Sequence, residues 1–256
     1  MKTDIQIKEE VKEKYAEIAR DGSNAAKTER KSSGGCSCSS KQEIVDISLN
    51  YRDEDKASIP DGADLGLGCG TPTAFANIKE GMTVLDLGSG AGIDCFVAAK
   101  HVGPTGKVIG VDMTEEMIKK ANENKSKISA ANVEFRFGEI ESLPVDSGTV
   151  DRVISNCVIN LVPDKEKAFS EIHRVLRAGG RFTVSDIVTD GKISDEERRD
   201  ASLWAGCVSG ALDKREYLGI IENAGFKEIQ VDSEIKNEYE LSSGAGLYSI
   251  TVTGTK

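Results

Sequence analysis

Between residues 83 and 190, short runs rich in β-branched residues alternate with segments of helical periodicity. The runs that predict strands are 83–87, 107–111, 132–137, 151–155 and 181–186. Strands that alternate with helices in this way predict a parallel sheet covered by helices on both faces. In such a sheet, ligands lie beyond the carboxyl ends of the strands.

A different pattern precedes the sheet. Ile7, Val11, Tyr15 and Ile18 follow spacings of four, four and three. This spacing predicts an amphipathic helix over residues 5–20 with one apolar stripe. The segment that follows, up to residue 40, is rich in Ser, Gly and Lys and predicts a flexible linker.

After residue 190 the pattern predicts two helices and then two strands, 226–231 and 247–254. Ser194 and Glu197 have the spacing of a capping box, and the helix that they open is expected to continue to Val208. The second helix is expected to begin after Asp213. We expect this part to form a lid or substrate-binding region on the sheet.

These patterns divide the chain into three expected parts. Residues 1–40 hold the amphipathic helix and the linker, residues 41–190 the ligand-binding sheet, and residues 191–256 the substrate-binding helices with the closing strands of the sheet.

Charge and hydropathy exclude several kinds of partner. The 256 residues include 33 Lys and Arg against 43 Asp and Glu, a net charge of −10, which is unfavourable for binding nucleic acid. No apolar run approaches the roughly 18 residues that span a bilayer, and the first 30 residues lack a signal-type apolar stretch. We therefore expect a soluble cytoplasmic protein that binds neither nucleic acid nor membrane.

A glycine-rich loop at 88–92 joins the first expected strand to a helix with the spacing G-x-G-x-G. Glycines there let the backbone approach a ligand closely. The dinucleotide fingerprint needs a glycine where this chain has Ile93, which disfavours a nicotinamide or flavin cofactor. Asp86 supplies a carboxylate for a ligand ammonium group, and Asp112 ends the next strand, where an acid can accept the hydroxyls of a ribose.

With Asp86 and Asp112, the loop resembles the cofactor site of class I S-adenosylmethionine-dependent methyltransferases. The turn at 138–140 resembles that family's adenine-binding turn, and 176–180 resembles its L-x-P-G-G turn, with Ala178 in place of proline. The resemblance implies a Rossmann-like α/β sheet and S-adenosylmethionine as cofactor. The residues implied to bind it are Asp86, Gly88, Gly90, Gly92, Asp112, Met113, Glu139, Ile140 and Asn156.

Six cysteines, at 36, 38, 69, 95, 157 and 207, lack the close paired spacings of a zinc ribbon, and in a reducing compartment most are expected to be free thiols. Cys157 follows the fourth expected strand, beside the glycine loop, and Cys69 and Cys207 can converge there if the last part folds over the cofactor. Three thiolates without a histidine cluster suit a soft, thiophilic centre. Cys95 lies among apolar residues of a helix and is expected to pack in the core.

The segments 67–72, 155–161 and 204–211, together with 14–20, resemble arsenite methyltransferases. Thr71 stands where those relatives have asparagine, so no role is carried over to that side chain. The resemblance implies that Cys69, Cys157 and Cys207 hold trivalent arsenic, that its methylation serves arsenic detoxification, and that Tyr15 reaches the cofactor.

Cys36 and Cys38 lie in the expected linker, where two interpretations stay open. They form either a chance exposed pair or a thiol relay that takes up a disulfide formed during arsenic redox chemistry, with a glutathione- or thioredoxin-type reductant as partner.

Two alternative functions also stay open. A carbon- or oxygen-methylating transferase for a small organic acceptor would keep Asp86 and Asp112 but would not need three separated thiols. A thiol-based metalloid-binding protein would bind arsenic without a nucleotide. Separate binding measurements with S-adenosylmethionine and arsenite would distinguish these classes.

Overall fold

The computed structural model describes residues 3–25, 51–199, 207–237 and 241–256. Cys36, Cys38 and Trp204 lie outside these ranges. In the described part of the chain, no helix combines the length and the apolar character needed to cross a bilayer.

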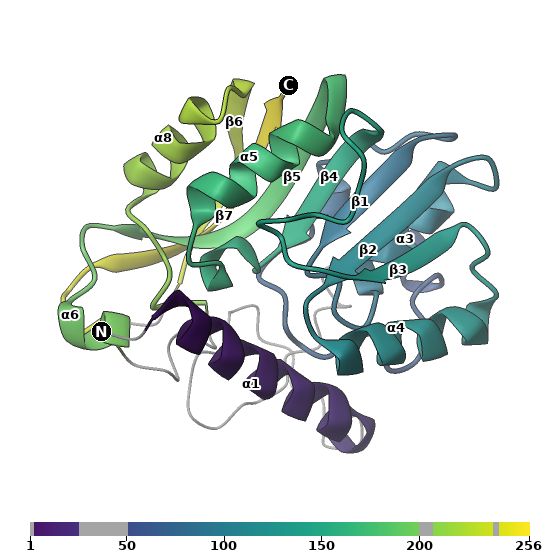
Figure 1. The fold of residues 1–256 in the computed structure, drawn as a ribbon, viewed down its shortest axis with the longest axis horizontal. Helices are drawn as coiled ribbons and strands as arrows, with labels where there is room; N and C mark the ends of the chain where they lie inside the picture. The colour runs from purple at the N-terminus through teal and green to yellow at the C-terminus, as the bar shows by residue number, and fades with distance from the viewer. Residues whose placement is uncertain (1–2, 26–50, 200–206, 238–240) are drawn as a thin grey trace.

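A seven-stranded sheet forms the centre of the molecule, with the strand order β3-β2-β1-β4-β5-β7-β6 (Figure 1). The five strands from β3 to β5 in this order are parallel, and β7 runs antiparallel to both of its neighbours. The strands are β1 Thr83–Leu87, β2 Lys107–Asp112, β3 Val133–Phe137, β4 Val150–Asn156, β5 Leu176–Asp190, β6 Lys227–Lys236 and β7 Gly246–Thr255. The mixed sheet agrees with the α/β class expected from the sequence.

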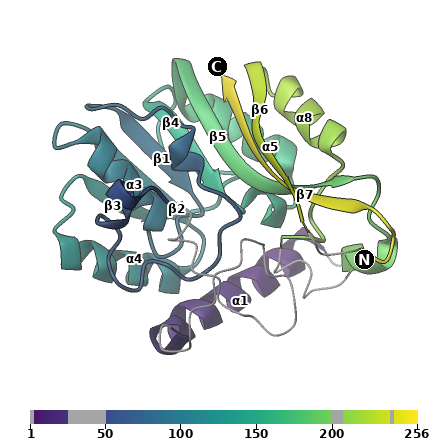
Figure 2. The same cartoon turned by 180° about the vertical axis from the view of Figure 1, so that it is seen from behind.

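Helices cover both faces of this sheet. In Figure 1, α5 and α8 lie in front of the strands and α3 lies behind them, and Figure 2 shows the reverse view. The α-helices are α1 Asp4–Ala25, α2 Asp53–Lys56, α3 Ile93–Val102, α4 Glu115–Ile128, α5 Lys165–Val175, α6 Asp195–Arg199 and α8 Lys214–Asn223. Two short 3₁₀ turns, η2 Pro72–Ala74 and η3 Ile159–Leu161, follow the Cys69 and Cys157 segments.

Side chains of β1 alternate between two hydrophobic clusters. Leu85 and Leu87 pack in the cluster that contains Phe169 of α5 and Tyr217 of α8. Val84 packs in the cluster that contains residues of α3. Because neighbouring strand residues point to opposite faces, a strand covered on both sides must be apolar at nearly every position.

The fifth expected strand is longer than its sequence pattern indicated. β5 begins at Leu176, directly after α5, so the segment 176–180, expected as a turn before the strand, lies within it. The pairing of β4 with β5 shifts register between Val150 and Arg152, which accommodates the two glycines as an irregularity of the ladder.

The helix that begins after Ser194 has the expected capping box. The Ser194 amide donates to Glu197 Oε2 at 2.9 Å, and the Glu197 amide donates to Ser194 Oγ at 3.2 Å. The expected extent is wrong at its far end, because Cys207 and Val208 are not helical and Cys207 has a φ of +63°. Residues 200–206 lie outside the described ranges.

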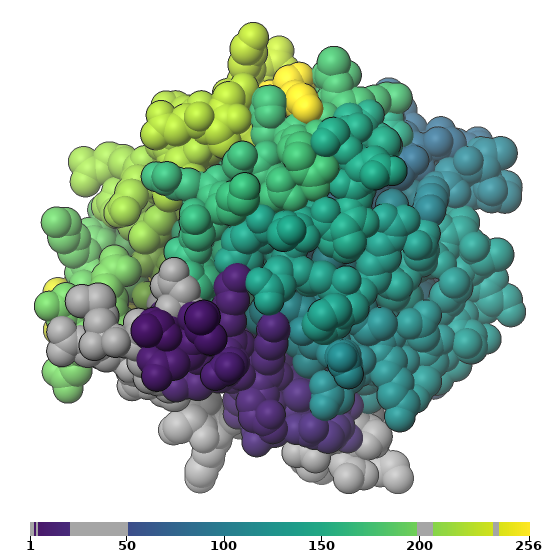
Figure 3. Space-filling model, viewed as in Figure 1, coloured from purple at the N-terminus to yellow at the C-terminus, as the bar shows by residue number. Residues whose placement is uncertain are grey.

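The N-terminal helix α1 lies directly against the central part of the chain (Figure 3). Val11 is buried, and Ile7 and Tyr15 pack against the hydrophobic cluster that includes Cys157 and Cys207. The stripe predicted from the sequence therefore docks the helix beside the cysteine segments.

Candidate active site

A pocket with about 1000 Å³ of empty volume, including its open mouth, lies at the carboxyl ends of β1, β2 and β4. This is the edge at which parallel α/β sheets bind ligands. Helix α1 contributes Lys8, Val11 and Tyr15 to its wall. The size and the mixed apolar and acidic lining suit a nucleotide-sized molecule.

The glycine loop shapes one wall of the pocket. A Cβ on Gly88 would lie 2.5 Å from the Val158 side chain, whereas a Cβ on Gly90 would meet no atom within 4 Å. Both residues line the pocket. Gly92 does not: a Cβ there would lie 2.8 Å from atoms of Phe96 and Phe135, so this glycine permits helix packing.

Asp112 lines the pocket and also orders the loop. Its Oδ2 accepts the Gly90 amide and its Oδ1 accepts the Thr114 amide, each at 2.9 Å. Burial raises the pKa of this carboxyl, and the backbone hydrogen bonds oppose that shift.

Met113 and Ile140 also line the pocket, but Glu139 does not. Glu139 instead forms ion pairs with Lys8 at 2.8 Å and Lys12 at 3.1 Å. Its placement indicates that it docks α1, and the hydrogen bond from Lys8 is the main cause that lowers its pKa.

Two buried carboxylates, Asp86 and Asp94, line the same pocket. Burial is the main cause that raises the pKa of both, to about 6 for Asp94. Asp94 accepts a hydrogen bond from Tyr51 at 2.8 Å, and neither carboxylate forms an ion pair with a basic side chain in the described ranges. This end of the pocket therefore favours a cationic group on a ligand.

Sequence reasoning missed Asp94 and Tyr51. Asp94 is the second residue of α3 and stands between apolar neighbours, a pattern that indicates a buried charge. Tyr51 lies far from the glycine loop in the sequence, and no local pattern connects the two.

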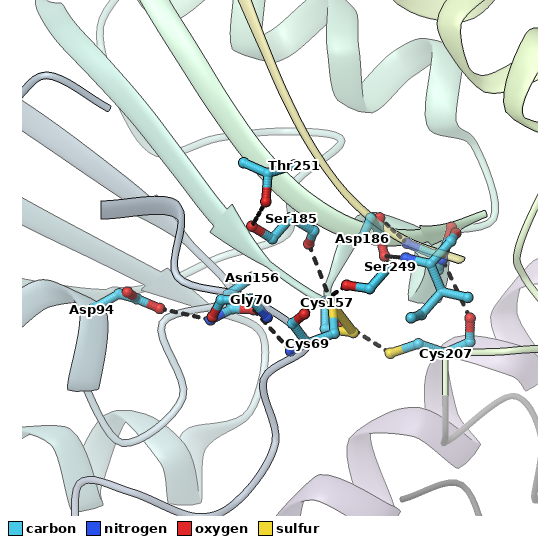
Figure 4. Close-up of a disulfide and its surroundings, with 12 residues drawn as sticks. Cys69, Gly70, Asp94, Asn156, Cys157, Ser185, Asp186, Cys207, Ser249 and Thr251 are labelled. Atoms are coloured by element: carbon cyan, nitrogen blue, oxygen red, sulfur yellow. Dashed lines mark hydrogen bonds between the residues drawn. A yellow bond between two sulfur atoms is a disulfide. The ribbon is translucent and has the colours of Figure 1, made fainter. Parts of the chain in front are cut away.

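The three expected arsenic ligands meet beside this pocket (Figure 4). Cys69 and Cys157 form a disulfide with their Cα atoms 5.6 Å apart, and Cys207 Sγ donates to the Cys157 carbonyl at 2.9 Å. Cys157 lines the pocket, whereas Cys69 and Cys207 do not line it and pack in the same hydrophobic cluster as Cys157.

The expectation of three separate thiolates thus differs from the structure, because two of the sulfur atoms are bonded to each other. Their Cα separation is ordinary for a disulfide. Among the described residues, no group of three His, Cys, Asp or Glu side chains is arranged to hold a metal ion.

Asn156 connects the cysteine segment with the acidic end of the pocket (Figure 4). Its Oδ1 accepts the amides of Cys69 and Gly70 at 3.1 and 3.2 Å. Its Nδ2 donates to the Gly70 carbonyl at 2.8 Å and to Asp94 Oδ2 at 3.1 Å. One side-chain amide therefore uses its full hydrogen-bonding capacity to join two segments of the site.

Cys95 is fully buried on α3, as expected for a core residue. Its thiol also forms a hydrogen bond, because Sγ donates to Asp86 Oδ2 at 3.2 Å.

An open sheet with a glycine loop, an acid at the end of the second strand and a pocket at their edge is the arrangement expected of a class I methyltransferase domain. Residues 78–225 match the family described as "Methyltransferase domain". The chain is 34% identical to an arsenic(III) S-adenosylmethionine methyltransferase from Chlamydomonas reinhardtii, with a TM-score of 0.69 over 82% of this chain and 72% of that one. The chain belongs to the arsenite methyltransferase family.

Curated proteins with the name arsenite methyltransferase match the chain, two of them over different shares of its length. One, from Halobacterium salinarum, is 45% identical over 97% of this chain and 66% of its own length. The other, from Homo sapiens, is 39% identical over 62% of this chain and 44% of its own length. The chain thus spans just under two thirds of the first relative and less than half of the second.

Proposed function

We propose that this chain transfers the methyl group of S-adenosylmethionine to trivalent arsenic held by Cys69, Cys157 and Cys207. The observation that carries the proposal is the meeting of these three cysteines, from three distant segments, beside a pocket of methyltransferase type. The names of the relatives support the same activity.

The residues of the pocket fit S-adenosylmethionine. The open space at Gly90 leaves room for a ligand against the loop, and Asp112 stands at the end of β2, where it can accept ribose hydroxyls. Asp86 and Asp94 supply negative charge for a ligand that carries an ammonium and a sulfonium group. When bound, this cofactor supplies an electrophilic methyl group.

In the reduced site, three thiolates would hold trivalent arsenic in a pyramidal arrangement that leaves its lone pair exposed. The lone pair is the nucleophile, so the chain needs no general base. The work of the protein is to hold the arsenic in near-attack geometry, which can supply up to about 7–11 kcal/mol. Asn156 serves this purpose, because it anchors the Cys69 segment to the pocket.

The disulfide supports a redox step after methyl transfer. A methylated trithiolate arsenic is a pentavalent cation. It returns to the trivalent state when two thiolates leave it as a disulfide and give it two electrons, and a hydroxide or an external thiolate then fills the open position on the arsenic that remains on the third cysteine. Cys69 and Cys157 are the pair positioned to do this. An external thiol reductant of the glutathione or thioredoxin type must then reduce the disulfide before the next arsenic binds.

The direct test incubates the protein with arsenite, S-adenosylmethionine and a dithiol reductant and separates the arsenic species by chromatography. Methylated arsenic is expected only when all three are present. A protein that binds S-adenosylmethionine but not arsenite would instead be a methyltransferase for an organic acceptor, and one that binds arsenite but not S-adenosylmethionine would be a metalloid-binding protein. Detoxification of arsenic and a cytoplasmic location accompany this proposal as predictions from the sequence.

A further inference from the structure

A fully buried asparagine, Asn160, lies between two of the cysteine segments. It belongs to η3, three residues after Cys157, and its Nδ2 donates to the Ile187 carbonyl at 2.6 Å and to the Cys207 carbonyl at 3.3 Å. Cys207 in turn donates from its Sγ to the Cys157 carbonyl at 2.9 Å. The two cysteines are therefore joined twice, once through their own hydrogen bond and once through Asn160.

Both cysteines have a backbone conformation that side chains rarely adopt. The φ angle is +61° at Cys157 and +63° at Cys207. Such conformations persist only where surrounding contacts determine them. The Cys157 amide donates to the Ser185 carbonyl at 2.7 Å, and the hydrogen bond from Asn160 holds the Cys207 carbonyl.

Two buried ionisable side chains hold Asn160 itself. Its backbone amide donates to Asp186 Oδ2 at 3.1 Å, and its carbonyl accepts from Lys165 Nζ at 3.3 Å. Lys165 also donates to the Val162 carbonyl at 3.0 Å, and Tyr217 donates to Asp186 Oδ2 at 3.3 Å. Burying these groups is costly unless their hydrogen bonds are satisfied, so the arrangement around Asn160 is a rigid one.

The hydrogen-bond partners also determine which way the amide group points. Asn160 Oδ1 is buried and accepts no hydrogen bond from the described residues. If the amide were reversed, this oxygen would face two carbonyl oxygens. Donation from Nδ2 is therefore what the side chain contributes.

We infer that Asn160 is a positioning residue that sets the separation of the Cys157 and Cys207 thiols for a shared thiophilic ligand. This inference rests on the proposed function, since it assigns the two cysteines to one arsenic atom. Asn160 does not line the pocket and acts through the backbone of Cys207 and the segment that follows Cys157.

The test uses phenylarsine oxide, whose arsenic binds two thiolates and releases water. The reduced full chain with Cys36→Ser, Cys38→Ser and Cys69→Ser keeps Cys157 and Cys207 together with the core residue Cys95. We expect one equivalent of phenylarsine oxide to bind to this background. Asn160→Ala should weaken binding by about tenfold or more, the usual effect of losing a group that orients a ligating residue.

Two comparisons separate positioning from general stability. Asn160→Asp keeps the shape but places an oxygen against the two carbonyls, so it should lose as much affinity as Asn160→Ala. Asn132 serves as the matched control, because its Nδ2 also donates to two backbone carbonyls, of Ala99 and Gly103, away from the site. Asn132→Ala should leave phenylarsine oxide affinity unchanged, and the affinity for S-adenosylmethionine should be the same in all variants.

Three results would count against the inference. Equal phenylarsine oxide affinity in the background and its Asn160 variants would overturn it while leaving the thiol site intact. A parallel loss of S-adenosylmethionine affinity in Asn160→Ala and Asn160→Asp would assign Asn160 to general support of the fold. Failure of the background itself to bind phenylarsine oxide would remove the paired thiol site, and with it both the proposed function and this inference.

Discussion

Two adjacent residues of α3 serve different neighbours in the site. Asp94 faces Tyr51 and Asn156, and Cys95 donates to Asp86. Because both side chains are buried, each contact is made in surroundings where an unpaired polar group is costly. The start of this helix therefore joins the acidic end of the pocket to the segment that bears Cys69.

The contribution of each cysteine can be separated by substitution. Cys157→Ser and Cys207→Ser are expected to abolish arsenite methylation, because a hydroxyl is a poor ligand for a soft centre. Cys95→Ser should remain active and lose at most about 1–3 kcal/mol of stability, since a serine hydroxyl can still donate to Asp86. Arsenic chromatography measures the loss of methylation, and thermal unfolding measures the loss of stability. If folded Cys95→Ser were inactive while Cys157→Ser stayed active, the assignment of Cys157 as a ligand and Cys95 as a core residue would be wrong.

The titration of Asp94 predicts how cofactor affinity depends on pH. Its pKa is raised to about 6 in the folded protein, mainly by burial. Binding of a cationic cofactor requires the ionised carboxylate, so below pH 6 a proton must leave on binding. Affinity for S-adenosylmethionine should then fall by up to about tenfold per pH unit.

Calorimetry between pH 5 and 7 would measure this dependence on Asp94. Asp94→Asn should bind more weakly at pH 7 and show a flatter profile. An unchanged profile in Asp94→Asn would exclude this carboxylate as the titrating group.

At the scale of secondary-structure elements, α1 forms one wall of the pocket and is held there by apolar packing and ion pairs. Lys8 bridges Glu139 and Glu141, each at 2.8 Å, while Val11 and Tyr15 cover the pocket. The apolar stripe and the ion pairs therefore act together to close the cofactor site.

Removing the charge of Lys8 tests the contribution of these ion pairs. Lys8→Gln should weaken S-adenosylmethionine binding by about 0.2–1 kcal/mol, because the partners are partly exposed and solvent screens them. High salt should reduce the affinity of the parent toward that of the variant. The matched control is Lys14→Gln on the same helix, because Lys14 forms no ion pair with a described residue. An equal loss of S-adenosylmethionine affinity in both variants would show that overall charge, and not the Lys8 ion pairs, is responsible.

At the scale of the whole molecule, the site is assembled from segments far apart in the chain. Cys69 precedes the first strand, Cys157 follows the fourth, and Cys207 precedes α8. Strand β5 anchors one of these segments, because the Ser185 carbonyl accepts a hydrogen bond from the Cys157 amide at 2.7 Å. The proposed catalytic cycle begins only when the disulfide between these two cysteines is reduced.

Cys36 and Cys38 are predicted to reduce the Cys69–Cys157 disulfide by thiol–disulfide exchange and then to be reduced themselves by the external reductant. A Cys36→Ser/Cys38→Ser chain should bind arsenite and S-adenosylmethionine normally and complete the first methylation with a strong dithiol reductant. With a weak reductant it should stall, because the disulfide between Cys69 and Cys157 would accumulate. The measurement is the progress curve of arsenite methylation with a series of reductants of different strength. Curves of the double variant that match those of the parent chain would refute the relay. Failure of the double variant to bind arsenite would instead indicate that Cys36 and Cys38 are arsenic ligands.

Much of the fold could be predicted from local pattern. All seven expected strands are present, and the expected N-terminal helix and the capping box of Ser194 and Glu197 are confirmed. Periodicity and capping depend on residues within a few positions of each other, so the sequence displays them directly. The predicted end of the helix opened by Ser194, at Val208, was wrong. Cys207 has a left-handed backbone conformation, and its carbonyl is held by a hydrogen bond from Asn160, a contact between distant segments that local pattern does not show.

What the sequence by itself determined is the set of elements, the glycine loop and the presence of acids and thiols at strand ends. The tertiary structure alone decided which of these side chains meet: Asp94 with Tyr51, Asn156 with the Cys69 segment, and Asn160 with the Cys207 carbonyl. It also placed β7 between β5 and β6. The physical reason is that element formation follows from local spacing, whereas these contacts arise when distant segments pack on one sheet edge and must satisfy each other's buried polar groups.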